Sequence, residues 1–119
     1  MSTYTGLDLA AIKRAVHHGG AAGLTEYLTD DVEFTQIDQR TPPATPARRT
    51  GRDALIALAE DLERHGILMR VDDGFLADDR GALRIVCTHP DGNQVVEHTL
   101  LTLRDGKIAC WSGVQAWDA

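Results

Sequence analysis

The sequence predicts an α+β domain in which a curled sheet of mixed or antiparallel strands wraps around about three helices from the N-terminal half, forming a cone with an internal pocket. Three observations predict this class. Apolar residues recur at helical spacing only before Gly66, and runs of β-forming residues separated by turns fill most of the chain after it. Tryptophan, tyrosine and phenylalanine occur only twice each, so a curled sheet is easier to leave hollow than to fill.

Length, charge and cysteine content limit the number of domains, the kinds of partner and the cellular compartment that we expect. At 119 residues the chain suffices for a single domain, residues 1–119. A net charge of −6 without a basic stripe argues against nucleic acid or an anionic membrane as partners. No apolar run is long enough to span a bilayer, and residues 1–4 show no signal-peptide pattern. Because two cysteines are too few for a disulfide scaffold, we expect a reduced, cytoplasmic protein, and because the sheet faces described below place Cys87 and Cys110 on opposite sides, we expect free thiols.

Apolar residues at helical spacing predict three helices. The first covers residues 7–18 and ends at the glycine pair that follows, and a short second helix covers residues 21–28. The third begins at Thr50, because the segment from Thr50 to Asp53 has the pattern of a capping box, and it closes at His65.

Runs of β-forming residues predict five strands, one before and four after the third helix: residues 32–38, 67–76, 82–89, 94–104 and 107–117. Between the first strand and the third helix lies a proline-rich segment at residues 40–50. Its three prolines exclude helix and central strand, so we expect a stiff loop that is either a functional flap or a disordered excursion.

The hairpin turns decide which side chains share a face of the sheet. Asp91-Gly92 and Asp105-Gly106 both favour a turn closed by a glycine bulge, although a two-residue turn competes at Asp105-Gly106 and would shift the register by one. With two bulges, the more apolar face, which should face the helices, holds Leu83, Ile85, Cys87, Val95, Glu97, Thr99, Leu101, Ala109, Trp111, Gly113, Gln115 and Trp117. The other face, a predicted homodimer surface, holds Arg84, Val86, Thr88, Val96, His98, Leu100, Thr102, Ile108, Cys110, Ser112 and Val114.

Three stretches carry a family resemblance: LTEYLTDDVEF at residues 24–34, TGRDAL at residues 50–55, and VVEH at residues 95–98 together with LRDGKI at residues 103–108. On these stretches and on the order of its elements, the chain resembles the nuclear transport factor two-like superfamily, which includes SnoaL-like polyketide cyclases and ketosteroid isomerases. The likeness covers nearly the whole chain. It implies the fold more than the chemistry, because this fold hosts unrelated activities.

The resemblance to ketosteroid isomerases implies three positions for catalytic groups. That family places a tyrosine on the first helix, an aspartate base on the first strand and an aspartic acid on a later strand; here these positions fall on Ile12, Gln36 and Glu97. Only Glu97 keeps a carboxyl, and the Gln36 amide has no useful pKa for proton transfer. The comparison therefore argues against steroid isomerisation by that mechanism.

Glu97 is the first candidate for chemistry because it lies mid-strand on the predicted inner face. Burial raises the pKa of a carboxyl, which can then act as a general acid or base near neutral pH. Gln36 could orient a carbonyl or a water, and Asp38 could be a base at the pocket mouth. Each also has a structural interpretation: Glu97 in solvent or in a structural hydrogen bond, Gln36 bonded to backbone, and Asp38 solvated at a strand end.

Aromatic walls with one amide suit a planar, partly polar ligand such as a fused-ring polyketide, although both tryptophans could instead be core. The predicted ligand-binding residues are Phe34, Ile12, Ile85, Thr99, Trp111 and Gln115. No residue pattern indicates a metal site or a cofactor, because no histidine has the spacing or carboxylate neighbours of a metal ligand. His17, His18 and His65 suit helix ends, His89 precedes a turn, and His98 points to the outer face.

These residues predict a small-molecule enzyme that performs general acid–base chemistry on a hydrophobic, ring-containing substrate. Cyclisation by aldol closure, double-bond isomerisation and epoxide opening all need only Glu97 assisted by Gln36 or Asp38. The alternative is a binding protein of the same fold without turnover, which the two lost isomerase groups favour. A dimeric protein–protein adaptor is the third hypothesis, for which the sequence shows no exposed recognition motif.

Overall fold

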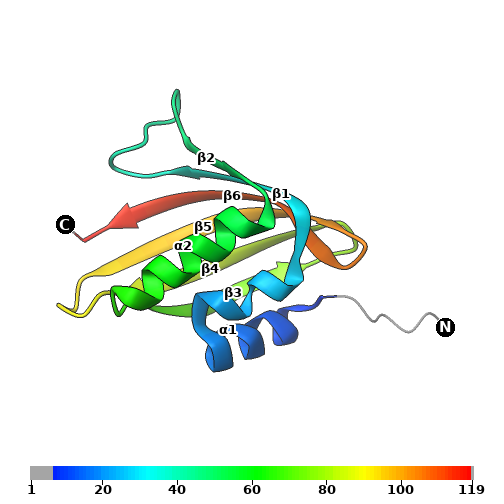
Figure 1. The fold of residues 1–119 in the computed structure, drawn as a ribbon, viewed down its shortest axis with the longest axis horizontal. Coiled ribbons are helices and arrows are strands. Elements are labelled where there is room, and N and C mark those ends of the chain that lie inside the picture. Colours follow the sequence, from blue (N-terminus) through cyan, green and yellow to red (C-terminus); the bar gives the residue numbers. More distant parts are fainter. Residues whose placement is uncertain (1–6, 119) are drawn as a thin grey trace.

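Six strands form one mixed sheet in the computed structural model of the chain, which describes residues 7–118 (Figure 1). The strands follow the order β2-β1-β6-β5-β4-β3, and all neighbours are antiparallel except β1 and β6, which are parallel. The α+β class predicted from the sequence is confirmed. The element bounds are α1 Leu9–Gly23, the 3-10 turn η1 Thr25–Tyr27, β1 Leu28–Ile37, β2 Ala47–Thr50, α2 Arg52–Arg64, β3 Leu68–Leu76, β4 Arg80–Thr88, β5 Gln94–Arg104 and β6 Lys107–Trp117.

The N-terminal helices differ from the prediction. Helix α1 follows Asp8, whose carboxylate accepts a hydrogen bond from the backbone N–H of Ala11 at 2.7 Å. The glycine pair interrupts the helix, as predicted: Gly20 has a non-helical φ of +61° and ψ of −152°, and a second helical segment follows it and ends at Gly23. The predicted second helix over residues 21–28 is shorter than expected, because it ends at Gly23, the 3-10 turn η1 follows, and Leu28 already belongs to β1. With α1 counted as one interrupted helix, the described residues hold two α-helices and one 3-10 turn.

Strand β2 is absent from the prediction, which treated the whole proline-rich segment as a loop. Its residues pair with β1, with Glu33 opposite Thr50 and Gln36 opposite Ala47. Thr50 consequently belongs to β2, and the capping box predicted there is wrong. The N-cap of α2 is Gly51 at φ +95°, which makes no side-chain capping bond.

The turn between β5 and β6 is the two-residue alternative, so the bulge predicted there is wrong. Arg104 pairs with Lys107, and both Asp105 and Gly106 have positive φ, at 52° and 75°, as a type I′ turn requires. The physical reason is that Asp-Gly accepts two successive left-handed residues at low cost.

A bulge at Ala109 then restores the register that the sequence predicted. Leu103 pairs with Ile108 but Thr102 pairs with Cys110, which leaves Ala109 as an extra residue of β6. Beyond the bulge the predicted inner face holds, with Glu97 opposite Gln115 and Leu101 opposite Trp111. Before it the faces are exchanged: Ile108, predicted on the outer face, is fully buried in the core.

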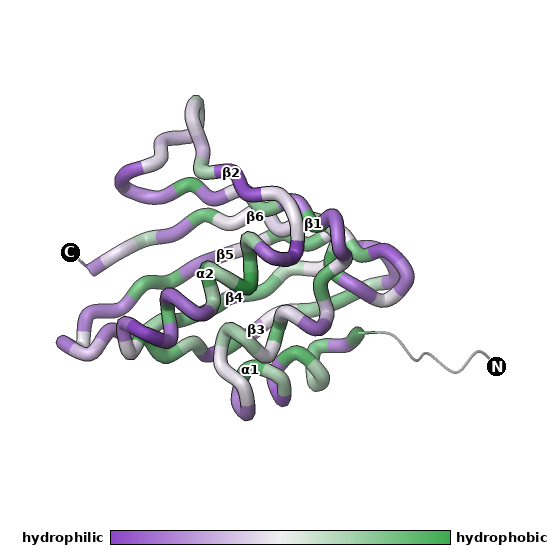
Figure 2. The backbone as a smooth tube through the Cα atoms, in the orientation of Figure 1, coloured by the Kyte–Doolittle hydropathy of each residue, from purple (hydrophilic) through white to green (hydrophobic). Residues whose placement is uncertain are grey.

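The hydrophobic core fills the space between the concave face of the sheet and the two helices. Helix α1 supplies Ile12 and Val16, and α2 supplies Leu55, which pack against apolar side chains of β1, β4, β5 and β6. In Figure 2 the strongly hydrophilic stretches gather at the loops that join the strands. Several of these core side chains, among them Phe34, Leu55 and Trp111, also line the cavity described below.

The convex face of the sheet is not covered by any described element. Leu100 is 68% exposed and Val114 is 53% exposed on this face. Both Cys87 and Cys110 are free thiols, as predicted. Neither helix among residues 7–118 has the length and apolar character needed to cross a membrane.

Candidate functional site

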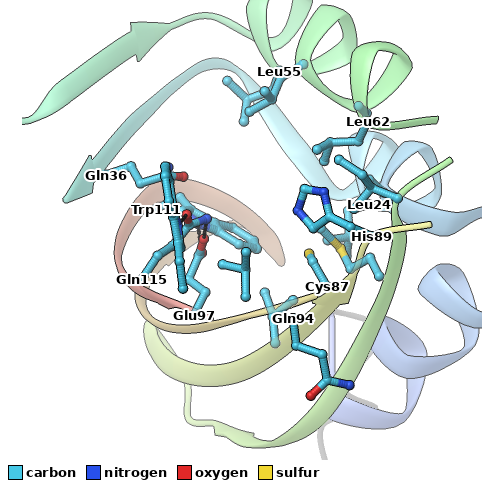
Figure 3. A pocket seen from close by; sticks show the side chains of 18 of the residues that line it. Leu24, Gln36, Leu55, Leu62, Cys87, His89, Gln94, Glu97, Trp111 and Gln115 are labelled. Atoms are coloured by element: carbon cyan, nitrogen blue, oxygen red, sulfur yellow. Dashed lines mark hydrogen bonds between the residues drawn. The ribbon is translucent and has the colours of Figure 1, made fainter. Parts of the chain in front are cut away.

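A cavity of about 470 Å³ lies between the concave face of the sheet, helix α2 and the end of α1 (Figure 3). Phe34 and Trp111 form a stacked pair in its wall, with ring centroids 6.4 Å apart. Aliphatic and sulfur-containing side chains form much of the remaining wall, including Leu24, Leu28, Leu55, Leu58, Leu62, Ile67, Met69, Ile85 and Cys87. A cavity of this size that combines apolar walls with a set of polar side chains is typical of a small-molecule site.

Glu97 brings a carboxyl group into the cavity wall from the middle of β5. Its side chain is only 7% exposed. The indole Nε1–H of Trp111 donates to its Oε2, and the amide Nε2–H of Gln115 donates to its Oε1, each at 2.8 Å. Both donors come from β6, whose register places Gln115 directly opposite Glu97. The strand pairing therefore assembles this group of three residues.

Trp117 fixes the orientation of the Gln115 amide. Its indole Nε1–H donates to Gln115 Oε1 at 2.8 Å. Because an indole nitrogen can only donate, the amide oxygen has to face Trp117, and the amide nitrogen then faces Glu97. Gln115 is thus held as a hydrogen-bond donor to the carboxyl.

Gly113 leaves the space in which the carboxyl lies. A Cβ atom at this position would be 2.7 Å from Glu97 Oε2 and 2.8 Å from Glu97 Cδ. No real Cβ contact is this short, so the carboxyl lies directly over the backbone of β6. A glycine inside a strand often marks such a close approach.

Burial is the dominant influence on the ionisation of Glu97. Removal from water raises the pKa of the Glu97 carboxyl above its ordinary value, while the hydrogen bonds from Gln115 and Trp111 act in the opposite direction and are outweighed. A carboxyl with a raised pKa is available in its protonated form closer to neutral pH, which is what a general acid needs.

The raised pKa of Glu97 predicts how stability depends on pH. The folded protein holds this proton more tightly than the unfolded chain, so the contribution of Glu97 to the free energy of unfolding is full below its ordinary pKa of 4.5 and is lost as pH rises through the folded-state pKa. Urea unfolding of the wild type and of Glu97→Gln from pH 4.5 upward should show the wild type losing stability relative to the variant. A constant difference across this range would contradict the prediction.

Gln36 and Asp38 form a second polar group at the end of β1. The Gln36 amide Nε2–H donates to Asp38 Oδ2 at 2.9 Å, and Asp38 Oδ1 accepts from the backbone N–H groups of Arg40 and Thr41 at 2.8 and 3.0 Å. Burial alone would raise the pKa of Asp38, but these hydrogen bonds outweigh it and hold the pKa below its ordinary value. Asp38 is thus an ionised group that orders the loop after β1.

The structure places the predicted site residues in two groups. Phe34, Gln36, Ile85, Glu97, Trp111 and Gln115 line the cavity. Ile12, Thr99 and Asp38 do not. Ile12 is fully buried in the core, Thr99 is 2% exposed, and the carboxylate of Asp38 is occupied by the loop that it caps.

Sequence reasoning missed several polar residues of the cavity wall, among them Arg40 and His89. The Cζ atom of Arg40, from the proline-rich loop, lies 5.6 Å from the ring centroid of Trp117. His89 extends the alternation of Ile85 and Cys87 by one more inward position, a signal that the sequence did contain. Among residues 7–118, no three histidine, cysteine, aspartate or glutamate side chains gather as a protein metal site would require.

Cys87 is predicted to be an unreactive thiol despite lining the cavity. Burial, with a smaller effect from the charge of Glu97, raises its pKa from 9.0 to about 11, which lowers its thiolate fraction at pH 8 about 100-fold. In a Cys110→Ser background, iodoacetamide should therefore modify Cys87 about 100-fold more slowly than a small-molecule thiol of pKa 9.0. Alkylation at the rate of that reference thiol would show that Cys87 is not buried in solution.

Solved structures share this architecture. They include an NTF2-like protein of unknown function from Mesorhizobium loti, with a TM-score of 0.72 and 23% identity over 91% of this chain and 87% of that one. A candidate ketosteroid isomerase from Kribbella flavida has a TM-score of 0.71 and 16% identity over 90% of this chain and 73% of that one. A loop-truncation variant of IdmH has a TM-score of 0.64 and 21% identity over 90% and 88%. At these identities the likeness shows the fold alone.

Curated protein sequences offer no match to this chain. The family of SnoaL-like domains, in contrast, matches residues 9–111, which is most of the chain. The match spans both helices, both halves of the sheet and the Glu97–Trp111 contact. The chain belongs to the SnoaL-like domain family.

Proposed function

We propose that this chain is a small-molecule enzyme in which Glu97 exchanges a proton with a hydrophobic, ring-containing substrate held in the cavity. The observation that carries the proposal is a buried carboxyl whose two protein partners are both hydrogen-bond donors. Neither the indole of Trp111 nor the amide nitrogen of Gln115 can accept a proton from it. A proton that reaches or leaves Glu97 therefore has to be exchanged with whatever occupies the cavity.

The cavity walls support a ring-containing substrate. The stacked pair of Phe34 and Trp111 offers a flat apolar surface beside the carboxyl. Gln36, whose amide nitrogen is bound to Asp38, has its amide oxygen left to accept a hydrogen bond from a substrate. Aldol cyclisation, double-bond isomerisation and epoxide opening each need one proton-transfer group in such an apolar site, so all three remain within the proposal.

The proposal is tested by measuring binding and turnover on the same compounds. Titration of the tryptophan fluorescence with fused-ring polyketones, β,γ-unsaturated cyclic ketones and aryl epoxides reports binding beside Trp111. Chromatography of the incubated mixtures reports product. We expect quenching with at least one class and conversion of that class by the wild-type protein. If one or more of these classes quench the fluorescence but none is converted to product, the enzymatic proposal is overturned.

A non-catalytic binding protein of the same fold is the second candidate function. The observation that favours it is that Ile12 and Gln36 occupy the positions at which the resemblance to ketosteroid isomerases implies ionisable groups, and Ile12 does not even reach the cavity. Tight binding without product in the experiment above is the result that this alternative predicts.

We further propose that the chain forms a homodimer through the convex face of the sheet. Exposed Leu100 and Val114 lie on this face, where Val114 is opposite His98 and Leu100 is opposite Ser112. Covering these apolar side chains would remove them from water. Light scattering at micromolar concentration should give twice the monomer mass, and Leu100→Glu should reduce it to the monomer mass. A monomeric wild type would contradict the proposal.

A further inference from the structure

Most polar side chains around the cavity are already used in hydrogen bonds within the protein. Gln115 joins Glu97 to Trp117, and the Gln36 amide nitrogen bonds Asp38. At the opposite end, Asp91 accepts hydrogen bonds from the backbone and side-chain N–H groups of Asn93 at 2.9 and 3.3 Å. These contacts stabilise turns and strand ends, so they leave few groups free to bind a ligand.

His89 is the exception at that end of the cavity. Figure 3 shows its imidazole among Leu24, Leu62 and Cys87, on the side opposite Glu97 and Trp111, while the neighbouring Gln94 points away from the cavity. Within residues 7–118, its ring makes no hydrogen bond or ion pair. A neutral imidazole carries one donor and one acceptor, and the apolar side chains around it satisfy neither.

The backbone around His89 is held firmly by the turn between β4 and β5. Its N–H donates to the carbonyl oxygen of Asn93 at 2.9 Å, and its own carbonyl oxygen accepts from the N–H of Gly92 at 2.9 Å. Gly92 has a φ of +91°, which closes the turn. The imidazole is therefore presented to the cavity by a fixed hairpin end, and its position does not depend on a mobile loop.

The strand register gives the separation of the two polar ends. Ile85 lies opposite Glu97, and His89 is four residues further along the same strand direction and on the same face. At about 3.3 Å per residue, the backbone positions of Glu97 and His89 are offset by roughly 13 Å along the strands. Between them the floor of the cavity is formed by Cys87 and Val95, which face each other across β4 and β5. The cavity thus has a polar group at each end and an apolar centre.

We infer that His89 is a specificity-determining residue that hydrogen-bonds the second polar group of an elongated, mostly apolar ligand whose first polar group meets Glu97. This inference rests on the proposed function of the cavity and deepens it, because it defines the substrate class by length and by the placement of its polar groups. A rigid molecule of two or more aromatic or alicyclic rings with an oxygen at each end fits this description. His89 is only half-buried, so a ligand with one polar end would leave its imidazole to bond water instead of the ligand.

A matched pair of probes tests the inference. The compounds 4,4′-dihydroxystilbene and 4-hydroxystilbene have the same rigid apolar framework and differ by one terminal hydroxyl. Isothermal titration calorimetry should give a Kd for the bisphenol roughly three- to tenfold lower than for the monophenol with the wild-type protein. His89→Leu should abolish this preference and leave the Kd of the monophenol within about twofold, because only the distal hydrogen bond is lost.

Two further variants separate hydrogen bonding from packing. His89→Gln keeps a donor and an acceptor at the distal end and should retain part of the preference. His18→Leu makes the same substitution on the exposed face of α1 and should leave both Kd values unchanged. A bisphenol preference that survives in His89→Leu would overturn the inference.

The outcomes distinguish this inference from the proposed function on which it rests. Equal Kd values of the two probes for the wild-type protein would overturn the role of His89 and leave a ligand-binding cavity in place. Failure of both probes to bind would count against the cavity as a ligand site and against the inference together. A bisphenol preference that disappears in His89→Leu and is unaffected in His18→Leu supports both.

Discussion

Glu97→Gln is expected to reduce turnover of a substrate of this protein by about 10²- to 10⁴-fold, the usual contribution of a positioned general acid or base. The amide that replaces the carboxyl has a similar shape but no useful pKa, so it cannot supply or take up a proton. The apolar walls are unchanged, so binding should be far less affected than kcat. Steady-state kinetics on the converted class of compounds measures the two effects separately.

A matched control establishes that the loss is chemical. Glu60→Gln makes the same substitution on the exposed side of α2 and should leave kcat unchanged. The glutamine amide has only one acceptor oxygen, so its NH₂ group must face the donor N–H of either Trp111 or Gln115. Glu97→Gln should therefore also cost about 1–3 kcal/mol of stability. Near-ultraviolet circular dichroism confirms that the variant is folded. Full turnover by folded Glu97→Gln would remove Glu97 from the reaction.

Most strands of the sheet could be predicted from the sequence, because their local patterns of apolar and polar residues are typical of β-strands. Alternating apolar and polar residues predicted β5 and β6 with the bounds that the structure gives them. Strand β2 carries no such signal, because Arg48 and Arg49 are not β-formers and the strand exists through backbone pairing with β1. The break at Gly20 did carry a signal, because two successive glycines favour the end of a helix, and Gly20 is non-helical in the structure.

The candidate site was predictable only where strand periodicity decides the direction of a side chain. The inner-face positions of Glu97, Trp111 and Gln115 depended on a bulge, and the sequence pattern was right about its effect but wrong about its place, which the structure moves to Ala109. Ile12 was expected in the pocket from a family resemblance, but the packing of α1 against the sheet buries it in the core. The depth at which a helix packs against a sheet depends on all the side chains of the core, so no local sequence pattern indicates it.

His89 shows the opposite case, a position that the pattern contained and the prediction passed over. It follows Ile85 and Cys87 at the strand period, so it had to share their face for as long as the ladder continued. The ladder does continue, because the His89 N–H still pairs with the carbonyl oxygen of Asn93 beyond the end of β4. A histidine before a turn thus shares the inner face when it lies an even number of residues after an inward one and the hairpin stays paired up to it.

Gly113→Ala is expected to reduce turnover by about 10²-fold while lowering stability by only about 1–3 kcal/mol. The new methyl group would lie 2.7 Å from Glu97 Oε2, so one of the two has to move. The end of a glutamate side chain moves more easily than the backbone of a central strand, so the carboxyl is displaced from the indole of Trp111 and the amide of Gln115. The displacement costs two hydrogen bonds and the alignment of the carboxyl with the substrate. Kinetics and urea unfolding on the same preparation measure both quantities.

A control variant and a double-mutant cycle distinguish displacement of Glu97 from general damage to the sheet. Gly19→Ala adds the same methyl group in α1, where nothing lies within 4 Å, so stability should be unchanged or raised by up to about 1 kcal/mol and turnover unaffected. If Gly113 acts by making room for the carboxyl, then adding Gly113→Ala to Glu97→Gln should cost little further turnover, because the group that it displaces is already inactive. Independent, multiplying losses in the double variant would instead mean that the alanine disturbs the strand itself, and that Glu97 does not owe its position to the missing side chain.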